Sequence, residues 1–202
     1  MWGVDADGEV ALRAACASFV RVSPVNLMLS GLLRRLLRGE RPGSPANLPQ
    51  DWTPPRPLGP LPTLVDLAAL PPAQQAVLAS LGTMVGQEPF VPGLYRMLAS
   101  WPAFLAHVAT VLRPHLQDTD TRSACTRLLD AVDAEIPAVF AALPSPPAAP
   151  PMPPAAEFAD VLAALDTYRK TSPEMVVFGR MIEDSLPSAP HSPLLRRSYE
   201  TE

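Results

Sequence analysis

The placement of its prolines is the feature that most constrains the fold of this chain. The sequence has 202 residues and 27 prolines, of which eight lie within residues 42–62 and seven within residues 144–154. A proline has no backbone N–H and a fixed φ, so neither segment can form a regular helix or a central strand. We expect two extended, polyproline-like linkers. A ligand for proline-reading modules is less favoured, because neither segment carries a clear basic-flanked PxxP pattern.

Outside these two segments, large apolar residues recur every three or four positions, which is the spacing of one face of an α-helix. No segment shows the alternation that a strand would require. We therefore predict an all-α fold of packed, kinked helices. The apolar pattern predicts helices over residues 8–22, 25–38, 72–85, 90–114, 119–143, 157–170 and 173–182.

Prolines inside these stretches are expected to interrupt their helices. In the stretch 90–114, Pro102 should kink the helix or restart it with Ser100 as the N-cap, and Pro114 should end it. Pro137 should interrupt the next helix. Trp101 belongs to the apolar stripe of the stretch 90–114, and we predict that it lies in the core.

One arrangement occurs twice in the chain: an amphipathic helix, a Ser-Pro step, an apolar helix and a charged, proline-rich exit. Ser23-Pro24 and Ser172-Pro173 are the matching steps, at which serine would cap a new helix and proline would open it. We interpret this as one complete and one partial pseudo-repeat, with the front half of the first repeat expected before Met1. The predicted parts are residues 1–42 (second half of the first repeat), 43–62 (proline-rich connection), 63–187 (second repeat, with the proline-rich insert 144–154) and 188–202 (flexible tail).

Charge and cysteine content limit the expected partners and location. The formal net charge is −4, which gives no reason to expect nucleic acid or an anionic membrane as a partner. No uninterrupted apolar run reaches membrane-spanning length, and the N-terminal residues lack a signal-peptide pattern. Cys16 and Cys125 lie far apart and in no CxxC motif, so we predict two small core thiols in a reduced, cytoplasmic protein.

The standard catalytic and metal-binding motifs do not occur in the sequence. The three histidines lack the spacing of metal ligands, so neither a metal nor a cofactor is predicted. His107 is expected on a polar or half-buried face, with a catalytic base as the less favoured alternative. Asp130, Asp133 and Glu135 bracket an apolar stripe, so a solvated helix face is favoured over an acid/base pair.

Two groups of polar residues are more suggestive. Arg34, Arg35 and Arg38 end a predicted helix, where they either form an anion site or, as we favour, complement the helix dipole. Tyr95 and Arg96 stand at a helix start, where a hydroxyl and a guanidinium could bind a small carboxylate or a leaving halide. A packed Tyr95 with an exposed Arg96 is at least as well supported.

The run VPGLYRMLASWPAFLAHVATVLRP resembles the group I 2-haloacid dehalogenases, an all-helical family that acts on both D- and L-2-haloalkanoic acids. The hallmark of that family is a VPxxYRxLAxxPxFL-type segment within two all-α pseudo-repeats. The resemblance covers about residues 10–186. It implies direct attack of water on the halogen-bearing carbon. An aspartate would activate that water and a polar side chain would orient it, in an apolar pocket between the repeats.

This chain departs from the family pattern at the residues that matter most for catalysis. The family's aspartate stands immediately before the motif tyrosine, where this chain has Leu94. The water-orienting asparagine falls at Ser23, with Asn26 one turn later. Tyr95 and Arg96, together with Ser23 and Asn26, are the candidates for substrate binding. Leucine cannot accept a proton, so the resemblance implies a 2-haloacid dehalogenase-like protein that has lost its base or uses another carboxylate.

A second hypothesis is a non-catalytic helical module that binds a small organic acid or a protein partner. The replacement of the expected carboxylate by Leu94 motivates it. If the pseudo-repeat interpretation holds, half of the first repeat is expected to be absent, and a pocket between repeats would then need a second chain to complete it, as in a homodimer.

Overall fold

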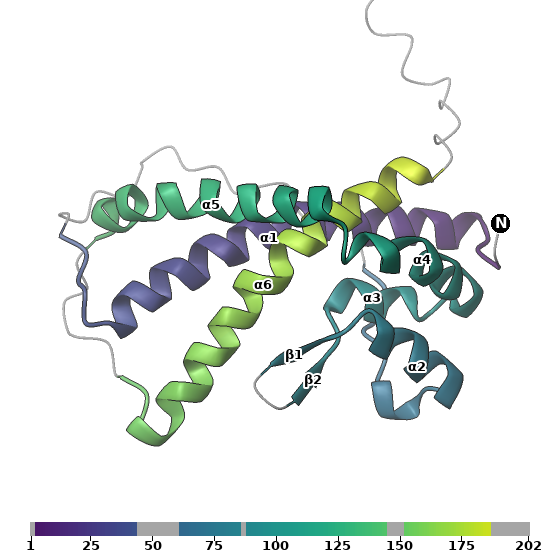
Figure 1. Ribbon diagram of the computed structural model, residues 1–202, viewed down its shortest axis with the longest axis horizontal. Helices are drawn as coiled ribbons and strands as arrows, with labels where there is room; N and C mark the ends of the chain where they lie inside the picture. The colour runs from purple at the N-terminus through teal and green to yellow at the C-terminus, as the bar shows by residue number, and fades with distance from the viewer. Residues whose placement is uncertain (1–2, 44–60, 86–87, 145–151, 187–202) are drawn as a thin grey trace, which may run out of the picture.

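The computed structural model describes residues 3–43, 61–85, 88–144 and 152–186 (Figure 1). These residues are mostly helical, which confirms the all-α prediction. Most of the two proline-rich segments, and the tail 188–202, lie outside the described residues. The elements are α1 (Ala6–Leu37), the 3-10 turn η1 (Leu67–Ala69), α2 (Pro72–Ser80), β1 (Thr83–Val85), β2 (Glu88–Phe90), α3 (Gly93–Leu98), α4 (Pro102–His115), α5 (Thr119–Ala142) and α6 (Ala155–Ser185).

The two longest helices, α1 and α6, cross each other and organise the fold (Figure 1). Gly179 of α6 permits the close approach. A Cβ atom at this position would lie 3.2 Å from Cγ2 of Val20 and 3.4 Å from the carbonyl oxygen of Cys16, both on α1. Helix α5 packs on both α1 and α6, and the shorter elements gather on one side of the crossed pair.

The apolar side chains form two separate cores. The larger one joins the N-terminal half of α1 to the C-terminal half of α6 and to α2, α3 and α4. The smaller one lies between the C-terminal halves of α1 and α5, where Leu32, Ile136 and Phe140 pack together. One continuous α1 therefore takes part in both cores.

The prediction that the Ser-Pro steps restart helices is wrong. Ser23 and Pro24 lie inside α1, and Ser172 and Pro173 lie inside α6. Counted from Ala6 and from Ala155, each serine is the eighteenth residue of its helix, and both are buried. An internal proline costs one hydrogen bond and about 3 kcal/mol. Each long helix tolerates it because its apolar face packs on both sides of the proline. The pseudo-repeat stays a prediction.

Helix breaks elsewhere follow the sequence only in part. The stretch 90–114 does divide, and α4 begins with Pro102 at its first position, but the N-cap is Trp101 and not Ser100. Pro114 does not stop α4, which continues to His115, and Pro137 lies within an unbroken α5. Trp101 is half-buried and packs against the larger core.

A small β-hairpin replaces the end of one predicted helix. Helix α2 ends at Ser80, and β1 then pairs antiparallel with β2, with Thr83 opposite Phe90 and Val85 opposite Glu88. The prediction that the chain contains no strand is therefore wrong for six residues. Strands of three residues are too short for alternation to distinguish them from a helical pattern.

Helix α1 is long and apolar enough to cross a membrane, which the sequence interpretation did not anticipate. This conclusion rests on the length and composition of the helix only, and 39% of its apolar 18-residue stretch is buried inside the structure. Core helices of soluble proteins and signal sequences pass the same test, so it is weak evidence. The cytoplasmic location and the absence of a membrane partner stay predictions.

Candidate functional site

The candidate site is built around a hydrogen bond between two helices far apart in the sequence. Tyr95 of α3 is fully buried, and its hydroxyl donates to Oε1 of Glu174 of α6 over 2.9 Å. Glu174 itself is half-buried, next to Pro173 in the middle of α6. The bond therefore brings the tyrosine of the 90–114 stretch to a carboxylate that the sequence analysis did not single out.

Burial shifts the pKa values of both partners upward. The pKa of Glu174 is raised, mainly because its carboxyl group is removed from water, while the bond from Tyr95 and the charge of Lys170 oppose the rise. The pKa of Tyr95 is raised well above its usual value by burial and then by the neighbouring Glu174. The tyrosine thus stays a hydrogen-bond donor, and the carboxyl group is a better proton acceptor when ionised than an ordinary glutamate.

Further polar groups surround this pair. Lys170 lies one helical turn before Glu174, and its ammonium group donates to Oγ1 of Thr83 in β1. The half-buried thiol of Cys125 on α5 has a raised pKa because of burial and of the nearby Glu174. Elements α3, α5, α6 and β1 thus bring a carboxylate, a cation, two hydroxyls and a thiol together. We call these residues (Thr83, Tyr95, Cys125, Lys170 and Glu174) the Glu174 cluster.

The position where the resemblance expects a catalytic aspartate belongs to the core. Leu94 is fully buried. Its Cδ2 atom would lie 3.8 Å from a Cβ atom added to Gly179, so it packs where α3 meets α6. A carboxylate at this position would be enclosed by apolar side chains. Leu94 is thus a packing residue, and Glu174 is the carboxylate that neighbours the motif tyrosine.

The other predicted site residues have different roles. Arg96 is half-buried, not exposed, and donates from Nε and Nη2 to the carbonyl oxygen of Val65, over 3.2 and 2.9 Å. Ser23 is buried within α1 and Asn26 is half-buried there. Among the described residues, no hydrogen bond joins Ser23 or Asn26 to Tyr95. Of the four candidates, Tyr95 is therefore the one that the described structure places in a hydrogen bond with an ionisable side chain, Glu174.

The remaining polar predictions have mixed outcomes. Cys16 is fully buried, as expected, and its pKa is raised to about 12, mainly by burial. Cys125 is only half-buried, so the prediction of two core thiols holds for one of them. Asp133 is not simply part of a solvated face, because it forms an ion pair with Arg169 of α6. Within the described residues, no cluster of three or more His, Cys, Asp or Glu side chains could hold a metal ion.

The sequence contained a weak signal for the missed residues. Lys170 and Glu174 are four positions apart on a helix and flank the second Ser-Pro step. Their opposite charges at this spacing would ordinarily indicate a surface ion pair. Only the packing of α3 against α6 shows that this face meets a buried tyrosine.

Comparison with known proteins adds no relative: no family model, no curated protein and no solved structure matches this chain.

Proposed function

We propose that the chain is a 2-haloacid dehalogenase-like protein in which Glu174 takes the part of the catalytic base. The observation that supports this function is the 2.9 Å hydrogen bond from Tyr95, the tyrosine of the dehalogenase-like motif, to Glu174. The reaction is the one that the resemblance implies, with its base on α6 and not at the position of Leu94.

The proposed reaction needs a base and direct attack of water. The ionised carboxylate of Glu174 accepts a proton from a water molecule, whose oxygen forms a bond to carbon 2 of the substrate. The carbon–halogen bond breaks, and its electron pair leaves with the halide. The products are a 2-hydroxy acid and a halide ion, and the proton remains on Glu174 until it passes to solvent.

The surroundings of Glu174 suit this role. The hydroxyl of Tyr95 holds one carboxylate oxygen, which fixes the orientation of the group. Lys170 places an ammonium group one turn away, where it would attract the carboxylate of a 2-haloacid. The raised pKa of Glu174 makes its carboxylate more basic than that of an exposed glutamate.

The test is halide release from racemic 2-chloropropionate and 2-bromopropionate, measured for the parent protein and for Glu174→Gln. We expect release by the parent and a decrease of roughly 10²–10⁴-fold in the variant, the usual contribution of a general base. Glu157→Gln is the matched control, because Glu157 is exposed at the start of the same helix. Equal activity of parent and Glu174→Gln would refute the assignment of the base.

Leu94→Asp is a poor rescue variant. It would place an unpaired carboxylate in a fully buried position, and such a change commonly costs several kcal/mol. Silence of that variant would therefore report on folding and not on catalysis.

The second candidate function is a non-catalytic module that binds a small organic acid. Two observations favour it. Leu94 is a buried packing residue at the position expected for the base, and the guanidinium group of Arg96 already donates to the carbonyl oxygen of Val65. On this hypothesis the parent releases no halide but binds 2-chloropropionate in a calorimetric titration, and Lys170→Met weakens that binding. Turnover of any 2-haloacid by the pure protein would exclude it.

A further inference from the structure

A second polar site lies away from the Glu174 cluster, where the C-terminal part of α1 meets α5 and α6. It is a cavity of about 230 Å³. Since a water molecule occupies about 30 Å³ in the liquid, the cavity has room for a small ion with several waters but not for a drug-sized ligand. Its lining consists of Gly31, Arg34, Arg35, Arg38, Asp133, Ile136, Pro137 and Arg169.

Four guanidinium groups line this small volume from two directions. Arg34, Arg35 and Arg38 come from the last turns of α1, whereas Arg169 comes from the middle of α6. The helix dipole of α1 would favour cations at its own C-terminus, but it does not account for Arg169. The pKa of Arg34 is lowered by removal from water and then by the positive charges of Arg169 and Arg38. An anion in the cavity would relieve this repulsion.

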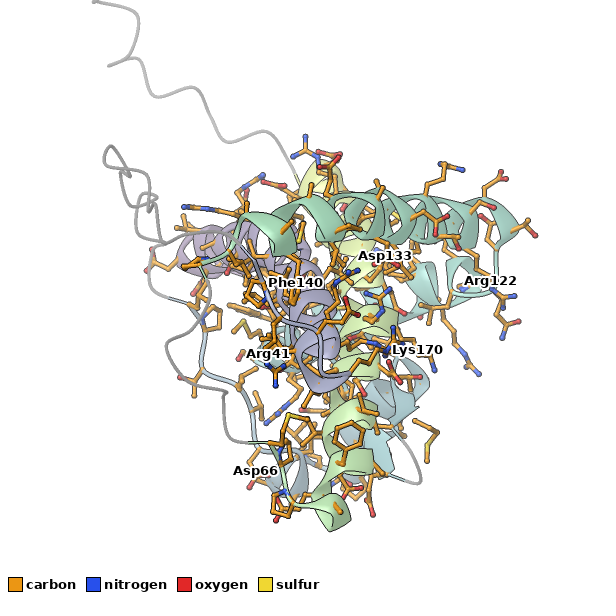
Figure 2. All side chains as sticks on the ribbon, turned by 90° about the vertical axis from the view of Figure 1, so that its left-hand side faces the viewer. Arg41, Asp66, Arg122, Asp133, Phe140 and Lys170 are labelled. Atoms are coloured by element: carbon orange, nitrogen blue, oxygen red, sulfur yellow. The ribbon has the colours of Figure 1, made fainter. Side chains whose placement is uncertain are left out.

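The acidic partners of these arginines leave one positive charge in excess. Asp166 pairs with Arg34, Glu40 with Arg35 over 2.5 Å, and Asp133 with Arg169. Among the described residues, Arg38 has no such partner. Figure 2 shows Asp133 and Phe140 on the side of α5 that faces α1 and α6.

Two buried polar atoms at the cavity lack a hydrogen-bond partner in the described structure: Nε of Arg35 and Oδ1 of Asp133. The first is a donor, and the guanidinium is held over the ring of Phe140, 5.1 Å from its centroid. The second is a carboxylate oxygen, which can only accept. Both atoms have almost no accessible surface, so a ligand in the cavity can pair them only when the two side chains shift slightly toward it. Leaving such groups unpaired is costly, and this cost favours the shift when a ligand is bound.

We propose that this cavity binds inorganic phosphate in its hydrogen phosphate form. The oxygens of phosphate accept from the guanidinium groups, which match phosphate geometry with paired donors. The P–O–H group donates to Oδ1 of Asp133, a buried acceptor that lacks a hydrogen-bond partner in the described structure. Sulfate has the same shape and charge but carries no proton at neutral pH, so its oxygens would face the carboxylate without a hydrogen bond. The site therefore selects phosphate over sulfate, and it is independent of the proposed dehalogenase reaction.

The experiment is isothermal titration calorimetry of the full chain with phosphate and with sulfate at matched ionic strength near pH 7. We expect saturable phosphate binding and at least about tenfold weaker sulfate binding, which is the effect of one charged hydrogen bond. Arg38→Gln should weaken phosphate binding about tenfold or more without lowering the melting temperature of the unliganded protein. Arg113→Gln, on the exposed side of α4, is the matched control and should bind phosphate as the parent does.

Two further results decide the role of Asp133. Asp133→Asn should improve sulfate binding relative to phosphate, because the unpaired carboxylate that excludes sulfate is removed. The proposal would be overturned if phosphate at millimolar concentration showed no saturable binding. It would also be overturned if the parent bound phosphate and sulfate with equal affinity. The proposal would also be overturned if the protein bound vesicles that contain phosphatidic acid but did not bind free phosphate, because the site would then recognise a lipid headgroup. Halide release should be the same in Arg38→Gln as in the parent.

Discussion

Among the described glycines, Gly31 is the one at which an added Cβ atom would come nearest to a neighbouring side chain, so replacing it by alanine gives a sharp test of the packing between α1 and α5. The added Cβ atom would lie 2.1 Å from Cδ1 of Ile136 and 3.1 Å from its Cγ1. Ordinary carbon–carbon contacts are about 3.5–4.0 Å, so Ile136 must move by more than about 1 Å. Overpacking of this kind costs about 1–3 kcal/mol, and the better helix propensity of alanine returns about 1 kcal/mol. We expect a net loss of about 1 kcal/mol.

The effect of Gly31→Ala on the free energy of unfolding should change from destabilising to stabilising when the obstructing methyl group of Ile136 is absent. Ile136→Val removes Cδ1 at a cost of about 0.5–1.5 kcal/mol, and the remaining contact then needs only a small adjustment. In the valine background, Gly31→Ala should therefore stabilise the protein by up to about 1 kcal/mol. Urea unfolding of the parent, both single variants and the double variant gives the coupling energy directly. An effect of Gly31→Ala that is the same in both backgrounds would refute the contact.

Further predictions concern the Glu174 cluster and the core. Tyr95→Phe should cost about 1–3 kcal/mol in urea unfolding at neutral pH, because it leaves the half-buried carboxyl group of Glu174 without its donor; an unchanged midpoint would contradict this. The raised pKa of Glu174 means that its contribution to stability is fully present below its usual pKa and is lost as the pH rises through the raised value, so Glu174→Gln should flatten the pH dependence of unfolding there. Trp101→Ala should cost on the order of 3 kcal/mol, at the low end for a large truncation because Trp101 is only half-buried; a thermal shift within noise would show that Trp101 is not part of the core. Iodoacetamide should label Cys125 slowly in the native protein and Cys16 only after unfolding, which mass spectrometry of tryptic peptides would reveal.

The sequence by itself determined the helical class of the fold and several helix limits. The three-to-four-residue spacing of apolar side chains placed α5 and the end of α4 to within one residue, because that spacing is a local consequence of helix geometry. Proline at the first helical position also marked the start of α2, since its fixed φ suits that position and its missing N–H is not needed there.

The continuity of the long helices was decided by tertiary packing. Pro24, Pro137 and Pro173 all looked like breaks, because a local rule counts only the lost hydrogen bond and the clash of the ring. The compensation comes from side chains that are distant in sequence, such as the packing of α1 against α6 around Gly179. Such contacts leave no local mark in the sequence.

The candidate site was likewise only half visible in the sequence. Tyr95 stood out through its motif, but its partner Glu174 lies 79 positions further along the chain and follows an ordinary helical spacing. Leu94 also shows what the sequence could not reveal. Its identity as leucine excluded a catalytic base, but only its complete burial in the structure showed that it is a packing residue. A sequence records which groups are available. The crossing of α1 and α6 decides which of them lose their water and meet, and burial is what shifts a pKa or leaves a donor without a partner.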